Sequence, residues 1–225
     1  MEHNKRVNSM KYIQSEKYNL AWFKLAECVS RREKERAMGV YRLLSHSLSD
    51  DALASQLKGD LLLCFNDEKA VEKYLEAANL YTKSQKMIEA IAIYEHLVFL
   101  EPDQDQHIVT LLNLYKKINM PFKIVYHIDR LIRDDKLDMA LQAIDNSASV
   151  MKCEDLIHLR KSIICGLLAF DDIPEEKVMG QIKRAIDELL SVNDELLLQK
   201  FLSEIKNMNS NYYKKTCDYL SKNAK

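Results

Sequence analysis

Apolar residues recur at intervals of three and four along almost the whole chain, which is the spacing that places them on one face of an α-helix. In the second such segment, for example, Ala37, Tyr41 and Leu44 share a face. Segments of this kind cover about 17–30, 33–48, 51–65, 68–83, 86–100, 104–118, 120–134, 136–149, 153–170, 175–191, 195–207 and 210–223. The pattern therefore predicts about twelve helices joined by loops of a few residues.

The scarcity of helix-breaking residues supports an all-α fold. The 225 residues include only 4 Gly and 3 Pro, and each proline (Pro102, Pro121 and Pro174) falls at a predicted turn or first helical position. Short loops make neighbouring helices antiparallel, and one helical hairpin cannot bury its own apolar face. We therefore expect residues 17–225 to form a single right-handed α-solenoid of stacked antiparallel hairpins, preceded by a tail over 1–16.

An internal repeat is clearest in the middle of the chain, over residues 71–104 and 105–138. The first of these segments has small and aromatic residues at regular helical positions and a proline near its end: Tyr74, Ala77, Ala78, Tyr81, Ala90, Tyr94, Leu97 and Pro102. Small residues let two helices approach closely, and aromatic side chains fill the space beside them. This segment resembles a tetratricopeptide repeat (TPR), and the resemblance implies a helical solenoid that binds a protein or peptide partner.

The second segment follows the same pattern less closely. It keeps the phase with Leu111, Tyr115, Ile124, Ile128 and Leu131. Leu112 and Lys136, however, occupy positions where the resemblance expects a small residue and a proline. The signature is lost in residues 150–225, which we interpret as a degenerate repeat or a cap.

The helix at 68–83 has two candidate partners, the helix at 51–65 and the helix at 86–100. Gly59 resembles the small residue of a first repeat helix, which favours the pairing with 51–65. Ala78 and Tyr81 carry the same signature within 68–83, and they favour the pairing with 86–100. We expect the second arrangement.

Charge is nearly balanced, with 33 basic and 34 acidic residues and a formal net charge of −1. Residues 1–50 carry 10 basic and 6 acidic side chains, whereas residues 51–104 carry 5 and 10. This modest gradient differs from the basic stripe that is typical of nucleic-acid binding. No nucleic-acid partner is expected, and a helical-repeat RNA-binding protein is the less favoured alternative.

The sequence contains no recognisable catalytic or metal-binding motif. No two of the six histidines are four residues apart, and neither HExxH, CxxC nor a glycine-rich phosphate loop occurs. The five cysteines are expected to be reduced and mostly buried. We therefore predict that the chain is not an enzyme and needs no cofactor or metal.

The longest apolar stretch, around 163–170, is far shorter than the roughly 20 residues that a membrane-spanning helix requires. The N-terminus lacks the apolar region of a secretory signal. The sequence thus predicts no membrane insertion and a cytoplasmic location.

A candidate peptide-binding groove follows from the resemblance, because the first helix of each TPR lines a concave surface. The corresponding positions are Glu72, Leu75, Asn79, Thr82 and Lys83 in the first repeat, and Gln106, Val109, Asn113, Lys116 and Lys117 in the second. Asn79 and Asn113 are one repeat apart, and their amides suit a peptide backbone. The lysines suit an acidic peptide or a terminal carboxylate, although Asn and Lys are also common on exposed helices. TPRs that clamp a terminal carboxylate have Lys where this chain has Leu75, so that mode is not expected.

The sequence is also compatible with two other binding modes. The segment Tyr74–Tyr81 is also similar to membrane-fusion adaptors of the soluble-attachment-protein type, which implies function on outer faces. Self-association is a further alternative, since a solenoid exposes apolar surface at any end without a polar cap. Trp22 and Phe23 are adjacent, so one helix cannot bury both on the same face.

Overall fold

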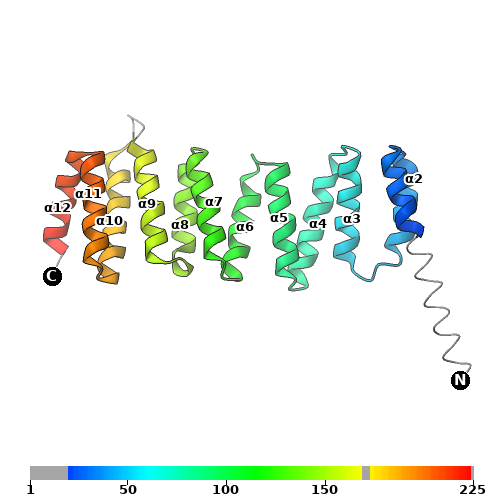
Figure 1. Cartoon of the computed structure of the whole chain (residues 1–225), viewed down its shortest axis with the longest axis horizontal. Helices are drawn as coiled ribbons and strands as arrows, with labels where there is room; N and C mark the ends of the chain where they lie inside the picture. Colours follow the sequence, from blue (N-terminus) through cyan, green and yellow to red (C-terminus); the bar gives the residue numbers. More distant parts are fainter. Residues whose placement is uncertain (1–19, 169–172, 224–225) are drawn as a thin grey trace, which may run out of the picture. The chain divides into compact units, whose positions relative to one another are not determined.

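The computed structural model describes residues 20–168 and 173–223, and these residues form helices and turns without any strand. After a first helix described over residues 20–30, the elements are α2 (Lys34–Ser45), α3 (Asp51–Cys64), α4 (Lys69–Lys83), α5 (Met87–Leu100), α6 (Asp105–Lys117), α7 (Pro121–Arg133), α8 (Leu137–Ser147), the 3-10 turn η1 (Ala148–Val150), α9 (Cys153–Leu168), α10 (Glu175–Val192), α11 (Glu195–Met208) and α12 (Ser210–Asn223). Figure 1 shows them as successive short helices. The all-α prediction is confirmed.

The predicted helix boundaries agree with the structure to within three residues wherever both can be compared. The predicted tail at 1–16, the start of the helix predicted from residue 17, and the end of the one predicted to residue 170 lie outside the described residues. No helix among those described is both long and apolar enough to span a membrane.

The chain divides into two compact units, with the boundary between His107 and Ile108 inside α6. In each unit, helices that follow one another in the sequence pack together. The prediction of a single solenoid over 17–225 concerns how the units join, and it stays a prediction.

Five of the short turns share one hydrogen-bond pattern. After the first helix, the Arg32 N–H donates to the Val29 carbonyl and the Glu33 N–H to the Cys28 carbonyl, at 3.0 and 2.9 Å. Such paired bonds define the Schellman motif, which needs one residue with positive φ. The residues at that position are Arg32, Asn66, Gln85, Asn119 and Asp135, with φ between 54° and 60°. Non-glycine residues therefore close these turns, which explains how so many helices form with so few glycines.

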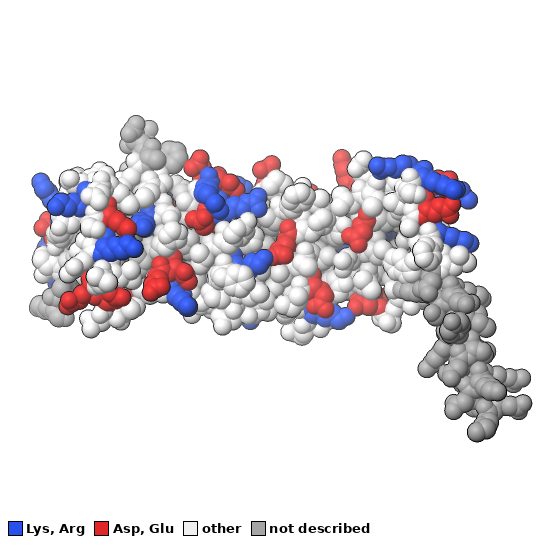
Figure 2. Space-filling model, in the orientation of Figure 1, with Lys and Arg blue, Asp and Glu red and all other residues white. Residues whose placement is uncertain are grey.

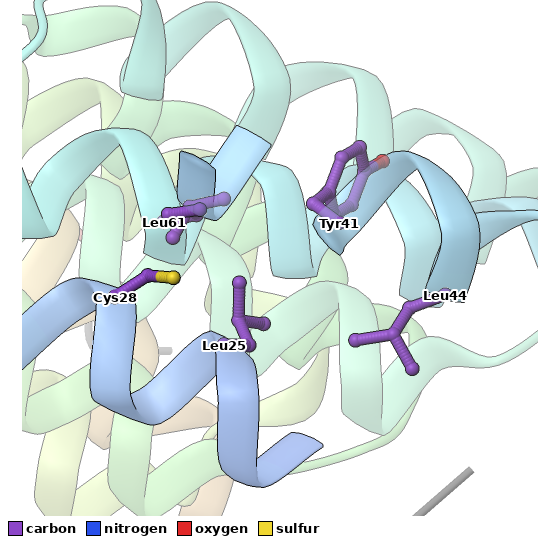
Figure 3. Packing of buried hydrophobic residues seen from close by; sticks show 6 residues of the cluster. Leu25, Cys28, Tyr41, Leu44 and Leu61 are labelled. Carbon is purple, nitrogen blue, oxygen red and sulfur yellow. The ribbon is translucent and has the colours of Figure 1, made fainter. Parts of the chain in front are cut away.

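The start of the first unit is held by a compact apolar cluster. Leu25 and Cys28 of the first helix pack with Tyr41 and Leu44 of α2 and with Leu61 of α3 (Figure 3). Trp22 lies partly buried against this cluster. Phe23, its neighbour in the sequence, is 74% exposed, so the expectation that a helix cannot bury both is confirmed.

α3 and α4 approach each other closely at Gly59. A Cβ atom on Gly59 would lie 3.0 Å from the ring of Tyr74, a side chain that is only 1% exposed. The Tyr74 hydroxyl donates to Asp60 at 2.6 Å. Burial of the ring, together with this bond to Asp60, raises the pKa of Tyr74 well above its usual value. Tyr74 thus anchors α4 on α3 through both packing and a hydrogen bond.

α4 contacts both candidate partners, but its more extensive contact is with α3 and not with α5. The signature at Ala78 and Tyr81 predicted the pairing with α5, whereas Gly59 pointed to α3. Tyr81 in fact also turns toward α3, where its hydroxyl donates to Gln56 at 2.9 Å.

The second unit is arranged in two layers of helices. One layer contains α7 and α9, which contact each other. The other contains α8, α10 and α12, which are joined by contacts and side-chain bonds described below. Its core is formed by large, fully buried side chains, among them Ile128, Ile144, Leu159, Ile163 and Phe201.

Replacing Gly59 by alanine is expected to destabilise the first unit by about 1–3 kcal/mol, because the new methyl group overlaps the enclosed Tyr74 ring. The matched control is Gly39→Ala on α2, where an added Cβ meets nothing within 4 Å. That variant should gain up to about 1 kcal/mol from the better helix propensity of alanine. Urea unfolding measures both, and an equal gain in the two variants would contradict the close contact.

Asp50 supports the same unit through its carboxylate. Oδ1 accepts hydrogen bonds from the N–H groups of Ala52 and Leu53, at 3.0 and 3.2 Å, and so caps the N-terminus of α3. Oδ2 pairs with Lys86 at the start of α5. The bond to Lys86, followed by the capping bonds, lowers the pKa of Asp50 below its usual range.

A lowered folded-state pKa predicts acid destabilisation. The contribution of Asp50 is fully present above its unfolded pKa of about 3.9 and is lost as the pH falls through the lower folded value. We expect the free energy of unfolding of the wild type to fall more steeply below about pH 4 than that of Asp50→Asn, which keeps a capping oxygen but has no group that titrates. Urea unfolding between pH 3 and pH 7 tests this, and parallel pH profiles would refute it.

Candidate functional site

A shallow pocket of about 40 Å3 lies between α6 and α8 in the second unit. Its lining comprises Val109, Leu112 and Asn113 of α6 and Met139, Gln142, Ala143, Asn146 and Ser147 of α8. Leu112, Ala143 and Ser147 are buried and form the floor, whereas Val109, Asn113, Gln142 and Asn146 are exposed. So small a volume cannot enclose a ligand, so any ligand would be held at the surface, and we call this depression the α6–α8 groove.

Helical periodicity places these side chains in the groove. Val109 and Asn113 are four residues apart on α6, and Gln142 and Asn146 are four residues apart on α8, so each pair shares a helix face. The opposite side of α6 is fixed in the core, where the Tyr115 ring stacks on His127 of α7 with ring centroids 5.6 Å apart. The groove is therefore built on anchored helices and not on loops.

The groove presents three side-chain amides around a small apolar floor. The amides of Asn113, Gln142 and Asn146 can each donate and accept hydrogen bonds, as the N–H and C=O groups of a peptide backbone require. Val109 and Met139 add apolar surface beside them. This combination suits an uncharged stretch of extended polypeptide.

Lys116 was expected to face a ligand, but its side chain contacts α8 and forms part of the groove wall. Its Nζ donates to the main-chain carbonyl of Asn146, in the last turn of α8. A cation is favourable at this end of a helix, where carbonyl groups lack partners within the helix. Lys116 therefore ties α6 to α8, while Lys117 is exposed.

The remaining predicted groove residues belong to the first unit. Glu72, Asn79 and Lys83 are exposed on α4, Leu75 and Thr82 are half-buried there, and Gln106 is exposed at the start of α6. Thr82 donates to the carbonyl of Ala78 at 2.8 Å. The structure thus brings together Val109, Asn113 and Lys116 with residues of α8. The expected alignment of Asn79 above Asn113 involves both units and stays a prediction.

The contribution of α8 was missed from the sequence. Met139, Gln142 and Asn146 lie where the repeat signature fades, so no position in that helix was assigned to the groove. The periodicity of residues 136–149 already contained the signal, since these three residues follow one another at intervals of three and four, outside the buried positions Ala140, Ala143 and Ile144.

Polar side-chain bonds also join α8 to α10 and α10 to α12 in the second unit. Between α8 and α10, Lys177 pairs with Asp138 and Arg184 with Asp145, both at 2.5 Å. Between α10 and α12, Lys215 pairs with Glu175, and the Tyr219 hydroxyl donates to Asp187 at 2.8 Å. These four bonds therefore join α8, α10 and α12 through their polar side chains.

A buried arginine lies beneath this part of the layer. Arg160 of α9 is 3% exposed, and its guanidinium donates to both carboxylate oxygens of Glu188, at 2.6–3.0 Å, and to the Gln181 side chain at 2.9 Å. Asp145 of α8 accepts a longer bond of 3.5 Å. The group connects three helices, and its geometry is that of a structural ion pair.

No protein-family model matches this chain, and no curated protein matches it. Within the described residues, no three His, Cys, Asp or Glu side chains are grouped so that they could hold a metal ion.

Truncation of Arg160 should destabilise the second unit strongly. Arg160→Met leaves the carboxylate of Glu188 and the amide of Gln181 without their buried partner, and we expect a loss of about 3–5 kcal/mol in the free energy of unfolding. Arg184→Met is the matched control, because the Arg184 side chain is 52% exposed and its pair with Asp145 lies at the surface. The control should lose less than about 1 kcal/mol. Similar losses in the two variants, measured by urea unfolding, would contradict a structural role for Arg160.

Proposed function

We propose that this chain is a non-enzymatic protein-binding module that holds an extended peptide segment of its partner in the groove between α6 and α8. The observation that carries the proposal is the set of three amides, Asn113, Gln142 and Asn146, around a small apolar floor on the outside of two anchored helices. The resemblance of residues 71–104 to a TPR points in the same direction.

The nature of the groove favours recognition of the peptide backbone over recognition of a particular side chain. Amides match the alternating donors and acceptors of a main chain, whereas the floor admits only a small apolar group. The neighbouring cation, Lys116, is already bonded to a carbonyl of α8. A partner segment with small or medium apolar side chains and little charge fits these features best.

The test begins with peptides selected on the full chain from a random library and titrated by fluorescence polarisation. The triple variant Asn113→Ala/Gln142→Ala/Asn146→Ala should bind the selected peptides at least about tenfold more weakly, since each amide bond contributes on the order of 1 kcal/mol. Circular dichroism verifies that the variant is folded.

The control variant removes three exposed amides elsewhere, Gln199→Ala/Asn207→Ala/Asn211→Ala on α11 and α12. It should bind like the wild type. If the groove variant keeps its affinity while the control loses affinity, or if both remain unchanged, the peptide is held by another surface and the groove assignment is wrong.

A further inference from the structure

A second and larger hollow lies in the first unit, between the first helix and α2. It has a volume of about 680 Å3. Its lining comprises Lys24, Glu27, Cys28 and Arg31 of the first helix, with Glu33, Arg36, Gly39, Val40, Arg42 and Leu43 at and along α2. None of these residues belongs to the α6–α8 groove, so the hollow requires its own explanation.

Apolar surface is left open within this hollow. Leu43 is 73% exposed, and an added Cβ at Gly39 would meet no atom within 4 Å. Glycine at position 39 lowers the stability of α2 by about 1 kcal/mol relative to alanine. No close contact within this unit requires a glycine there. Leu20 is 54% exposed and lies four residues before Lys24, on the same face of the first helix.

The rim of the hollow has an excess of positive charge. Two of its four cations are neutralised, since Arg31 pairs with Glu27 and Arg36 with Glu33, each at 2.7 Å. Lys24 and Arg42 have no acidic partner among the described residues. Figure 2 shows Lys and Arg atoms gathered over α2, with acidic atoms among them. The hollow therefore combines an apolar floor with two uncompensated cations.

We propose that this hollow binds an acidic amphipathic helix of a partner protein. Two adjacent antiparallel helices form a groove that a third helix can occupy. Apolar side chains of the incoming helix would cover Leu43, Val40 and the open surface at Gly39, while its carboxylates would meet Lys24 and Arg42. Arginine and lysine beside a partly desolvated apolar surface favour such carboxylate contacts.

The charge pattern favours an acidic protein segment over other anionic partners. Glu27 and Glu33 in the wall oppose the closely spaced phosphates of a nucleic acid, and among the residues that the structure describes no aromatic side chain lines the hollow to stack on a base. A lipid surface would need a projecting apolar face and not a concave one. The chain's own residues 1–19 carry four basic and two acidic side chains, so their charge does not complement the hollow.

The test uses the full chain and a fluorescein-labelled helical peptide of about 14 residues, with leucines along one face and glutamates elsewhere. We expect this peptide to bind more tightly than a peptide with the same leucines and lysines in place of the glutamates, and its affinity to fall as salt rises. Lys24→Glu/Arg42→Glu should weaken binding at least about tenfold. Gly39→Leu should also weaken it by filling the floor without changing any charge.

The control is Lys200→Glu/Lys214→Glu, which reverses two exposed lysines on α11 and α12 and should leave the affinity unchanged. The α6–α8 groove variant should likewise bind as the wild type does, which separates this site from the proposed peptide groove. The proposal is overturned if no probe binds, if the lysine peptide binds equally well, or if the Lys24/Arg42 variant keeps its affinity. Tighter binding of oligouridine or of phosphatidylserine vesicles than of the acidic peptide would overturn it as well.

Discussion

The close approach of α3 and α4 depends on the absence of a side chain at Gly59, and the way α4 lies against α3 follows from it. The Tyr74 ring occupies the space that any larger residue at position 59 would need. With the ring enclosed, its hydroxyl reaches Asp60 and Tyr81 reaches Gln56. These contacts hold α4 with one face against α3, so Asn79 and Lys83 are directed to solvent.

The helices could be predicted from the sequence because their pattern is local. Within each helix, buried positions recur every three or four residues. The helices end at turn residues such as Asn66 and Asn119, which adopt the left-handed conformation that the turn requires. It was harder to predict which neighbouring helix α4 contacts more extensively. The pairing of α4 depends on which small residue meets a large one in the neighbouring helix, and Gly59 and Tyr74 are fifteen positions apart.

The candidate groove could be predicted only in part, for a related reason. Val109 and Asn113 were found because they lie in a segment that keeps the repeat pattern, whereas Gln142 and Asn146 lie in one that does not. A groove is formed by two helices, and its chemistry becomes visible only when both are known. The role of Lys116 was unpredictable from sequence, since the main-chain carbonyl that it binds, that of Asn146, has no signature in the amino-acid pattern.

The repeat signature is lost in residues 150–225, where ion pairs and other polar side-chain bonds link neighbouring helices. In the first unit, a small residue opposite an aromatic ring fixes α3 and α4, and this arrangement requires particular residue types at fixed spacing. In the second unit, ion pairs across α8, α10 and α12 and the buried Arg160 group join neighbouring helices, as the pair of Asp50 and Lys86 does between the starts of α3 and α5 in the first unit. Such ion pairs fix the relative position of two helices without requiring residues at a fixed spacing in the sequence. A long side chain can reach its partner from several positions along a helix. Between α6 and α8, Lys116 supplies one such link through the main-chain carbonyl of Asn146. The side chains of Asn113, Gln142 and Asn146 are exposed there, and their amides are therefore accessible to a peptide backbone.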